Sequence, residues 1–194
     1  MAALIVFGVV TAIICWTVYR YIVRWRTKQQ YLNDFIFPES IHRKLSGHYK
    51  TLKKPQIEDI TEGLRDFLRI LQPLKDPQAT PPSKAIALAW QGFIEEGECY
   101  REFCGTLYGT EAKYQTIDLA AYGEDNPSLR MSWTGACAIE KINPTRPDRL
   151  PRMFCLDATL EIEDGYRYHI GSNPAEQTEG SIDVSKIGRH VELV

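Results

Sequence analysis

The first 19 residues, MAALIVFGVVTAIICWTVY, contain no charged side chain. A helix of about 20 apolar residues crosses a hydrocarbon core of roughly 30 Å, because each helical residue rises about 1.5 Å. We therefore expect one membrane-spanning helix from Met1 to about Val23, with Arg20 reaching toward the lipid headgroups. Aromatic side chains cluster at the carboxyl end of this run, where an interfacial belt is typical: Trp16, Tyr19, Tyr21 and Trp25.

A basic collar follows the apolar run, and residues 1–30 contain no acidic side chain. Its members, which we expect to face lipid headgroups, are Arg20, Arg24, Arg26 and Lys28. Basic residues gather on the cytoplasmic side of a membrane, so the collar predicts that the rest of the chain is cytoplasmic. Of 23 basic residues 19 lie beyond the collar, where they are outnumbered by 25 acidic ones. The expected location is the cell (inner) membrane, with one span and an acidic carboxyl-terminal body.

Two alternatives to an anchor are weighed. A cleavable signal peptide has a basic start and a small-residue cleavage site, whereas this run begins without a basic residue and ends in YRYIVRWR. A buried core helix is not typically followed at once by four basic residues. Within the run, Gly8 and Ala12 form a small-xxx-small pair, which would allow two spans to pack as a homo-oligomer.

Composition places the remainder among ordinary globular domains. The chain is 44% hydrophobic and 25% charged, with a net charge of −2, which gives no sign of nucleic-acid binding. Five cysteines without close paired spacing favour a reducing compartment. We expect an anchor and collar over residues 1–30, a linker with a short helix over 31–54, and a helical cytoplasmic domain over 55–194.

Helical periodicity dominates the body, and the predicted fold class is mainly α with a minor short β element near the carboxyl end. A helix is expected from Ile57 to about Pro73, and others over SLRMSWTGACAIEKI and after Asp148. The strongest stripe predicts one helix between Ser83, its expected N-cap, and Gly109. Its apolar positions are Ile86, Trp90, Phe93, Gly97, Tyr100, Cys104 and Leu107. YRYHI, after the turn signal Asp164–Gly165, is expected to form a short strand.

No complete catalytic motif is present. The histidines and cysteines lack the CxxC, HxxxH and HExxH spacings that aim two metal ligands from one element. There is no GxSxG elbow and no phosphate loop, so we assign no catalytic residue, no cofactor and no metal.

One acidic helix face leaves two interpretations open. Glu95, Glu98 and Glu102 recur at steps of three and four residues. Such a face serves either as an acid/base pair or cation site, or simply as a solvated surface, and the second is the more common.

Two stretches are similar to the glycine-rich-domain-containing-protein-like family of uncharacterised proteins. The first is PPSKAIALAWQGFIEEGECYREFCGTLYG, whose matching residues are Trp90, Tyr100, Phe103, Cys104, Tyr108 and Gly109. The second, WTGACAIEKINPTRPDRLPRMFCLDATLEIEDGYRYHI, resembles the bacterial branch. The resemblance spans about residues 80–170 and implies a bacterial protein. Where that family has histidines this chain has Gln91 and the run Glu111-Ala112-Lys113-Tyr114, so the resemblance implies that a histidine site has been lost.

These observations predict a single-pass, membrane-anchored protein whose helical domain acts as an interaction or scaffold module. Its expected partners are the lipid bilayer and another protein, but no nucleic acid. An alternative is a membrane-tethered enzyme, for which a hydrolase is the leading class. Its candidate pocket would be formed by Trp90, Gln91, Glu95, Tyr100 and Cys104. A third alternative is an accessory subunit of a membrane complex.

Overall fold

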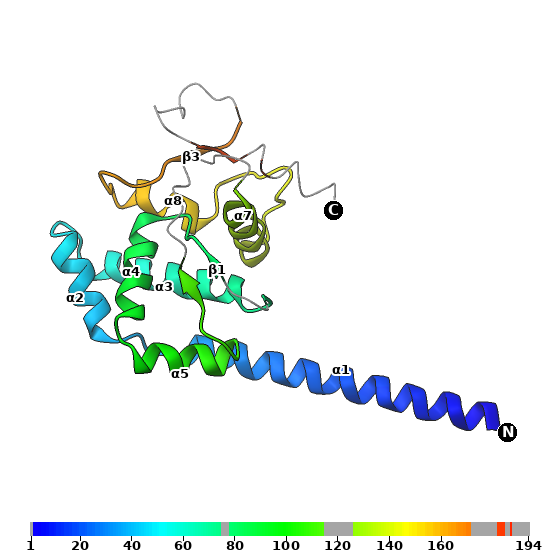
Figure 1. Ribbon diagram of the computed structural model, residues 1–194. Helices are drawn as coiled ribbons and strands as arrows, with labels where there is room; N and C mark the ends of the chain where they lie inside the picture. Colours follow the sequence, from blue (N-terminus) through cyan, green and yellow to red (C-terminus); the bar gives the residue numbers. More distant parts are fainter. Residues whose placement is uncertain (1, 75–77, 115–125, 172–181, 185–186, 188–194) are drawn as a thin grey trace. The chain divides into compact units, whose positions relative to one another are not determined.

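The computed structural model describes residues 2–74, 78–114, 126–171, 182–184 and 187, and the chain divides into two units, Met1–Ile36 and Phe37–Val194 (Figure 1). The fold is mainly helical, as the sequence predicts, with seven helices in the described residues. The two units are described separately below.

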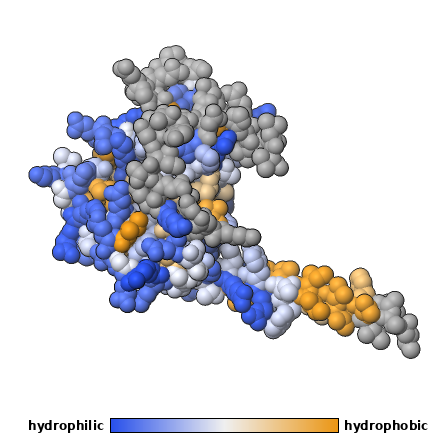
Figure 2. Space-filling view, in the orientation of Figure 1, coloured by the Kyte–Doolittle hydropathy of each residue, from blue (hydrophilic) through white to orange (hydrophobic). Residues whose placement is uncertain are grey.

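The first unit is a single long helix, α1 (Ala2–Asp34). Its segment Val6–Asp34 has a mean hydropathy of 1.8 in its most apolar window and is long and apolar enough to cross a membrane. None of that window is buried by other parts of the chain, and Figure 2 shows it as a hydrophobic rod. The hydroxyls of Thr17 and Thr27 donate to helix carbonyls at 2.8 and 3.0 Å, so these polar groups are satisfied without water.

The second unit, which we call the body, is built around α3 (Lys54–Leu71). This helix packs against α2 (Glu39–His48), α4 (Lys84–Ile94), α7 (Pro127–Glu140) and α8 (Arg152–Thr159). Pro55 lies in the first turn of α3, where its missing N–H costs little. The helix buries its apolar face. The ring of Phe67 on this face packs against the ring of Trp90, with centroids 5.4 Å apart. On another side of α3, a methyl group on Gly135 of α7 would lie 2.7 Å from Ile70, so only glycine permits this close approach.

Strands are few and short in the described residues. β1 (Gln78–Ala79) pairs in parallel with β2 (Lys113–Tyr114), and β3 (Tyr168–His169) pairs in parallel with β4 (Ile182–Asp183). The β3–β4 pair is the minor β element expected near the carboxyl end.

The long helix expected between Ser83 and Gly109 is two helices, α4 and α5 (Glu98–Leu107). Ser83 does cap the first, accepting a hydrogen bond from the Ile86 N–H at 3.2 Å. The break occurs at Gly97, which has a positive φ of 55° that glycine adopts without a steric penalty. The expectation of one continuous acidic face across Glu95, Glu98 and Glu102 is therefore wrong, because Glu95 is the C-cap of α4 whereas Glu98 begins α5. The last predicted helix is also displaced, since α8 begins at Arg152 with Pro151, not Asp148, at its N-cap.

Candidate functional site

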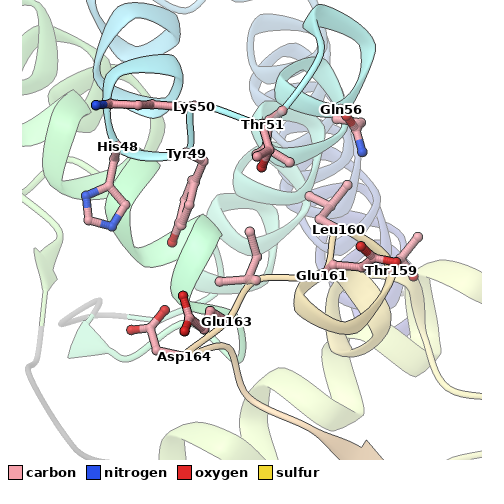
Figure 3. Close-up of a pocket in the computed structure, with 12 residues that line it drawn as sticks. His48, Tyr49, Lys50, Thr51, Gln56, Thr159, Leu160, Glu161, Glu163 and Asp164 are labelled. Atoms are coloured by element: carbon pink, nitrogen blue, oxygen red, sulfur yellow. The ribbon is translucent and has the colours of Figure 1, made fainter.

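The body contains a cleft of about 730 Å³ between two segments that are distant in sequence (Figure 3). One wall consists of residues 48–52 and Gln56, from the end of α2 and the start of α3. The other consists of residues 159–164, which run from the last residue of α8 into the turn after it. The volume falls within the roughly 300–1,000 Å³ typical of small-ligand sites.

Tight turns at the helix ends direct the polar side chains of both walls. On the first wall the Tyr49 N–H donates to Leu45 O at 2.8 Å, which closes α2, and Lys53 N–H donates to Gln56 Oε1 at 2.8 Å, which opens α3. On the second wall Glu161 takes a left-handed conformation with φ 54°, and Ile162 N–H returns to Asp157 O at 2.9 Å. These turns bury Ile162 and leave Glu161 exposed.

Asp157, beneath the second wall, ties it to the amino end of α4. Its side chain is buried, and its two carboxylate oxygens accept four hydrogen bonds. The donors are Ser83 Oγ at 2.6 Å and the backbone N–H groups of Lys84, Ala85 and Tyr166 at 2.8, 3.3 and 2.9 Å. A carboxylate at this position also complements the positive end of the helix dipole. This one side chain therefore holds three segments in register: α4, α8 and the turn before Tyr166.

The turn that follows Asp157 requires a glycine. A methyl group on Gly165 would lie 2.6 Å from Asp157 Cβ, closer than carbon atoms can approach. Just before it, Asp164 accepts a hydrogen bond from Lys84 Nζ at 3.1 Å. That bond, together with the charge of Lys84, holds the pKa of Asp164 below its ordinary value. The wall at residue 164 is thus fixed from α4 as well.

Tyr49 is the aromatic group of the cleft. Its side chain is partly buried, and Figure 3 shows its hydroxyl end pointing toward Glu163 and Asp164. Burial, followed by the charges of Asp157 and Asp164, raises the pKa of Tyr49 from 10.0 to about 12. The phenol therefore stays protonated at neutral pH and can donate a hydrogen bond. The His48 ring meets the Tyr49 ring edge-on, with centroids 4.6 Å apart.

Several polar groups of the cleft are available to a ligand. Glu161 and Glu163 are exposed and form no ion pair with a described residue. The Thr51 and Thr159 hydroxyls have no hydrogen bond to His48 among the described residues, so no hydroxyl–imidazole pair is assembled there. The arrangement can bind a polar group through hydrogen bonds and charge.

The pocket residues suggested by the sequence lie elsewhere. Three of them form one buried cluster, in which Trp90 Nε1 donates to Tyr100 Oη at 3.0 Å and Tyr100 Oη donates to Ala112 O at 2.5 Å. Cys104 is buried beside them, and burial raises the pKa of its thiol. Gln91 is partly buried, and Glu95 is exposed and pairs with Lys44 of α2 at 2.5 Å. None of the five lines the cleft.

Sequence reasoning missed the cleft because its two walls are about a hundred residues apart. One local signal was available, the Asp164–Gly165 turn, and the structure places that turn at the edge of the second wall. No group of three or more metal-ligating side chains is found among the described residues.

The comparison with family models gives one match, UCP032817-like, over residues 27–191. The resemblance to the glycine-rich-domain-containing-protein-like family is therefore wrong, and the bacterial origin inferred from it loses its support. The Trp90, Tyr100 and Cys104 positions on which that resemblance rested are core positions of α4 and α5. No curated protein and no solved structure matches the chain.

Proposed function

The chain belongs to the UCP032817-like family, an uncharacterised family, and we propose that it is a single-pass membrane-anchored interaction module. In this proposal α1 is the anchor, the body lies on the cytoplasmic side, and the cleft of Figure 3 receives a polar group of a partner.

The observation that carries the proposal is the exposure of the apolar helix. Large apolar side chains of α1 such as Phe7, Trp16 and Tyr21 are 72, 60 and 71% exposed. A helix of the core of a soluble protein would be covered by its neighbours, whereas lipid would cover this one. The basic collar at its carboxyl end supports the cytoplasmic placement of the body.

Binding is better supported than catalysis within the described part of the body. A broad apolar docking face is not the means, because Ile139 is the only large apolar side chain of the body among those described as exposed, at 36%. The cleft instead offers a phenol and the carboxylates of Glu161 and Glu163, which form no ion pair with a described residue and recognise a complementary polar or charged group. Anchoring confines the partner search to the membrane surface and raises the effective concentration of the two proteins.

A membrane-tethered hydrolase is the second candidate, and the observation that favours it is the convergence of His48, Tyr49 and Asp164 in a concave site. Its site would be this cleft rather than the surroundings of Trp90. The hydrolase hypothesis would need a nucleophile that a ligand or conformational change brings to His48.

The anchor is tested by carbonate extraction of membranes and by topology reporters fused after Val194. We expect the intact chain to stay in the membrane pellet and the fused reporter to be active in the cytoplasm. A mature chain that starts near residue 25, or reporter activity on the opposite side, would contradict this function.

The role of the cleft is tested by crosslinking in the native host, with Glu163→Lys compared with Glu102→Lys on α5. Both variants reverse one exposed glutamate, but only the first lies in the cleft. We expect the first to lose a crosslinked partner that the second and the wild type retain. Equal crosslinking by both variants would contradict a role for the cleft.

A further inference from the structure

The segment from Ser40 to Ile57 contains five Lys and Arg residues and no Asp or Glu. It covers α2, the first wall of the cleft and the start of α3. Each of these basic residues can pair with an acidic group, either within the protein or on a binding partner.

One of these five basic residues forms an ion pair within the body, and the other four form none with a described residue. Lys44 pairs with Glu95 at 2.5 Å and links α2 to α4. The other four are exposed and form no ion pair with a described residue. These four, which we call the basic rim, are Arg43, Lys50, Lys53 and Lys54. Figure 3 shows the amine end of Lys50 directed away from Glu163 and Asp164, so it is not engaged across the cleft.

We propose that the basic rim docks on anionic lipid headgroups of the leaflet that faces the body. This inference rests on the proposed function, because it requires α1 to be in a membrane. Only the four residues Phe35–Pro38 separate α1 from α2. From Lys28 in the collar, about 9 Å of helix and at most about 18 Å of extended chain lead to the start of α2. The ten residues of α2 add about 15 Å before Lys50. This short tether allows the rim to reach the headgroups.

The acidic groups around the rim form no ion pair with it among the described residues. Glu58 and Asp59, which follow Lys54 by four and five residues, are exposed. Glu39 pairs with His42 at 3.6 Å, and Asp164 on the far wall pairs with Lys84. Glu161 and Glu163 also lie on the far wall of the cleft. Of the residues that line the cleft, Lys50 lies on the first wall, and Glu161, Glu163 and Asp164 lie on the second. The first wall, with the rest of the rim beside it in sequence, is therefore the side that an anionic leaflet attracts.

Docking would also decide where the cleft meets its ligand. Lys50 belongs both to the rim and to the lining of the cleft. Its neighbours His48 and Tyr49 also line the cleft. A rim in contact with headgroups therefore places the cleft mouth at the membrane–water interface. The partner group would be a polar one presented at that interface. A basic residue at an anionic surface favours binding by roughly fivefold, and the four act together.

The test uses the full chain reconstituted in two kinds of nanodisc, one of phosphatidylcholine and one that also contains phosphatidylserine. Each lysine is acetylated with an amine-reactive ester, and its rate is read by mass spectrometry. We expect Lys50, Lys53 and Lys54 to react at least about fivefold more slowly in the anionic nanodisc. Lys141, which is exposed after α7, should react equally in both. At about 1 M salt the Debye length shrinks to roughly 3 Å, and the protection should disappear.

Two charge variants sharpen the result. Arg43→Gln combined with Lys53→Gln should reduce the protection of Lys50 severalfold. Arg101→Gln combined with Lys141→Gln removes the same charge from exposed positions outside the rim and should leave that protection unchanged. Equal thermal midpoints of the two double variants would show that both fold.

Equal acetylation of the rim in both nanodiscs would overturn the inference, as would a rim protected by a single-stranded oligonucleotide in neutral nanodiscs but not by phosphatidylserine. Carbonate extraction of membranes that contain the chain keeps the two proposals apart. If the chain resists extraction and the rim ignores lipid charge, only this inference fails. If the chain is extracted, the anchor itself fails.

Discussion

Replacing Asp157 should be among the most damaging single changes in the body. Asp157→Ala removes the acceptor of four hydrogen bonds. Of the four donors, the Ser83 hydroxyl and the Ala85 N–H belong to buried residues, whereas Lys84 and Tyr166 are partly exposed and can turn to water. Each buried donor left unpaired costs about 1–3 kcal/mol. For two such donors we expect a loss of about 2–6 kcal/mol, a large part of the roughly 5–15 kcal/mol that stabilises a typical domain.

Asp157→Asn separates hydrogen bonding from shape. Each carboxylate oxygen accepts two bonds, Oδ1 from Ser83 and Ala85 and Oδ2 from Lys84 and Tyr166. An asparagine keeps one acceptor oxygen, but its amide NH2 group faces the other pair of donors and cannot accept their hydrogen bonds. The loss should be about half that of the alanine variant.

The assay is urea unfolding of the full chain in a mild non-ionic detergent, followed by tryptophan fluorescence. The matched control is Asp148→Ala, an exposed aspartate near the start of the same helix, which should change the free energy of unfolding by less than about 0.5 kcal/mol. The reasoning is refuted if Asp157→Ala is as stable as this control, or if Asp157→Asn is as damaging as Asp157→Ala.

Three further changes test the core, the cleft and its turn. Trp90→Ala should cost about 3–5 kcal/mol, because the ring is fully buried, and urea unfolding measures it. The folded state holds the Tyr49 proton up to about pH 12, whereas the unfolded state loses it near 10.0. The stability that the protonated Tyr49 contributes is fully present below pH 10 and is lost as the pH rises from 10.0 to about 12. Tyr49→Phe should therefore flatten the decline of the thermal midpoint with pH over that range. Gly165→Ala should lose about 1–3 kcal/mol by collision with Asp157, whereas Gly105→Ala, in an open helical position, should gain up to about 1 kcal/mol by calorimetry.

The sequence was sufficient for those features that one segment encodes by itself. The run without charges predicted a long apolar helix, because length and apolarity are properties of the segment alone. The helical period from Ile57 predicted α3, and Ser83 predicted the start of α4, because an N-cap acts on N–H groups two or three residues away. A local pattern failed at Gly97, since its place on the apolar stripe hid a positive φ that only the backbone reveals.

The candidate site required the tertiary structure. In the sequence, Trp90, Tyr100 and Cys104 suggest a functional pocket. In the structure they lie in the core, where the Trp90 N–H and the Tyr100 hydroxyl are hydrogen-bonded. Tyr49 and Glu163 carry no motif, and they share a cleft because Asp157 joins the turn after α8 to the amino end of α4. That junction depends on which distant surfaces fit together and on which buried carboxylate finds its donors. Such complementarity is a property of the packed chain, and it cannot be predicted from the residue pattern of either wall of the cleft alone.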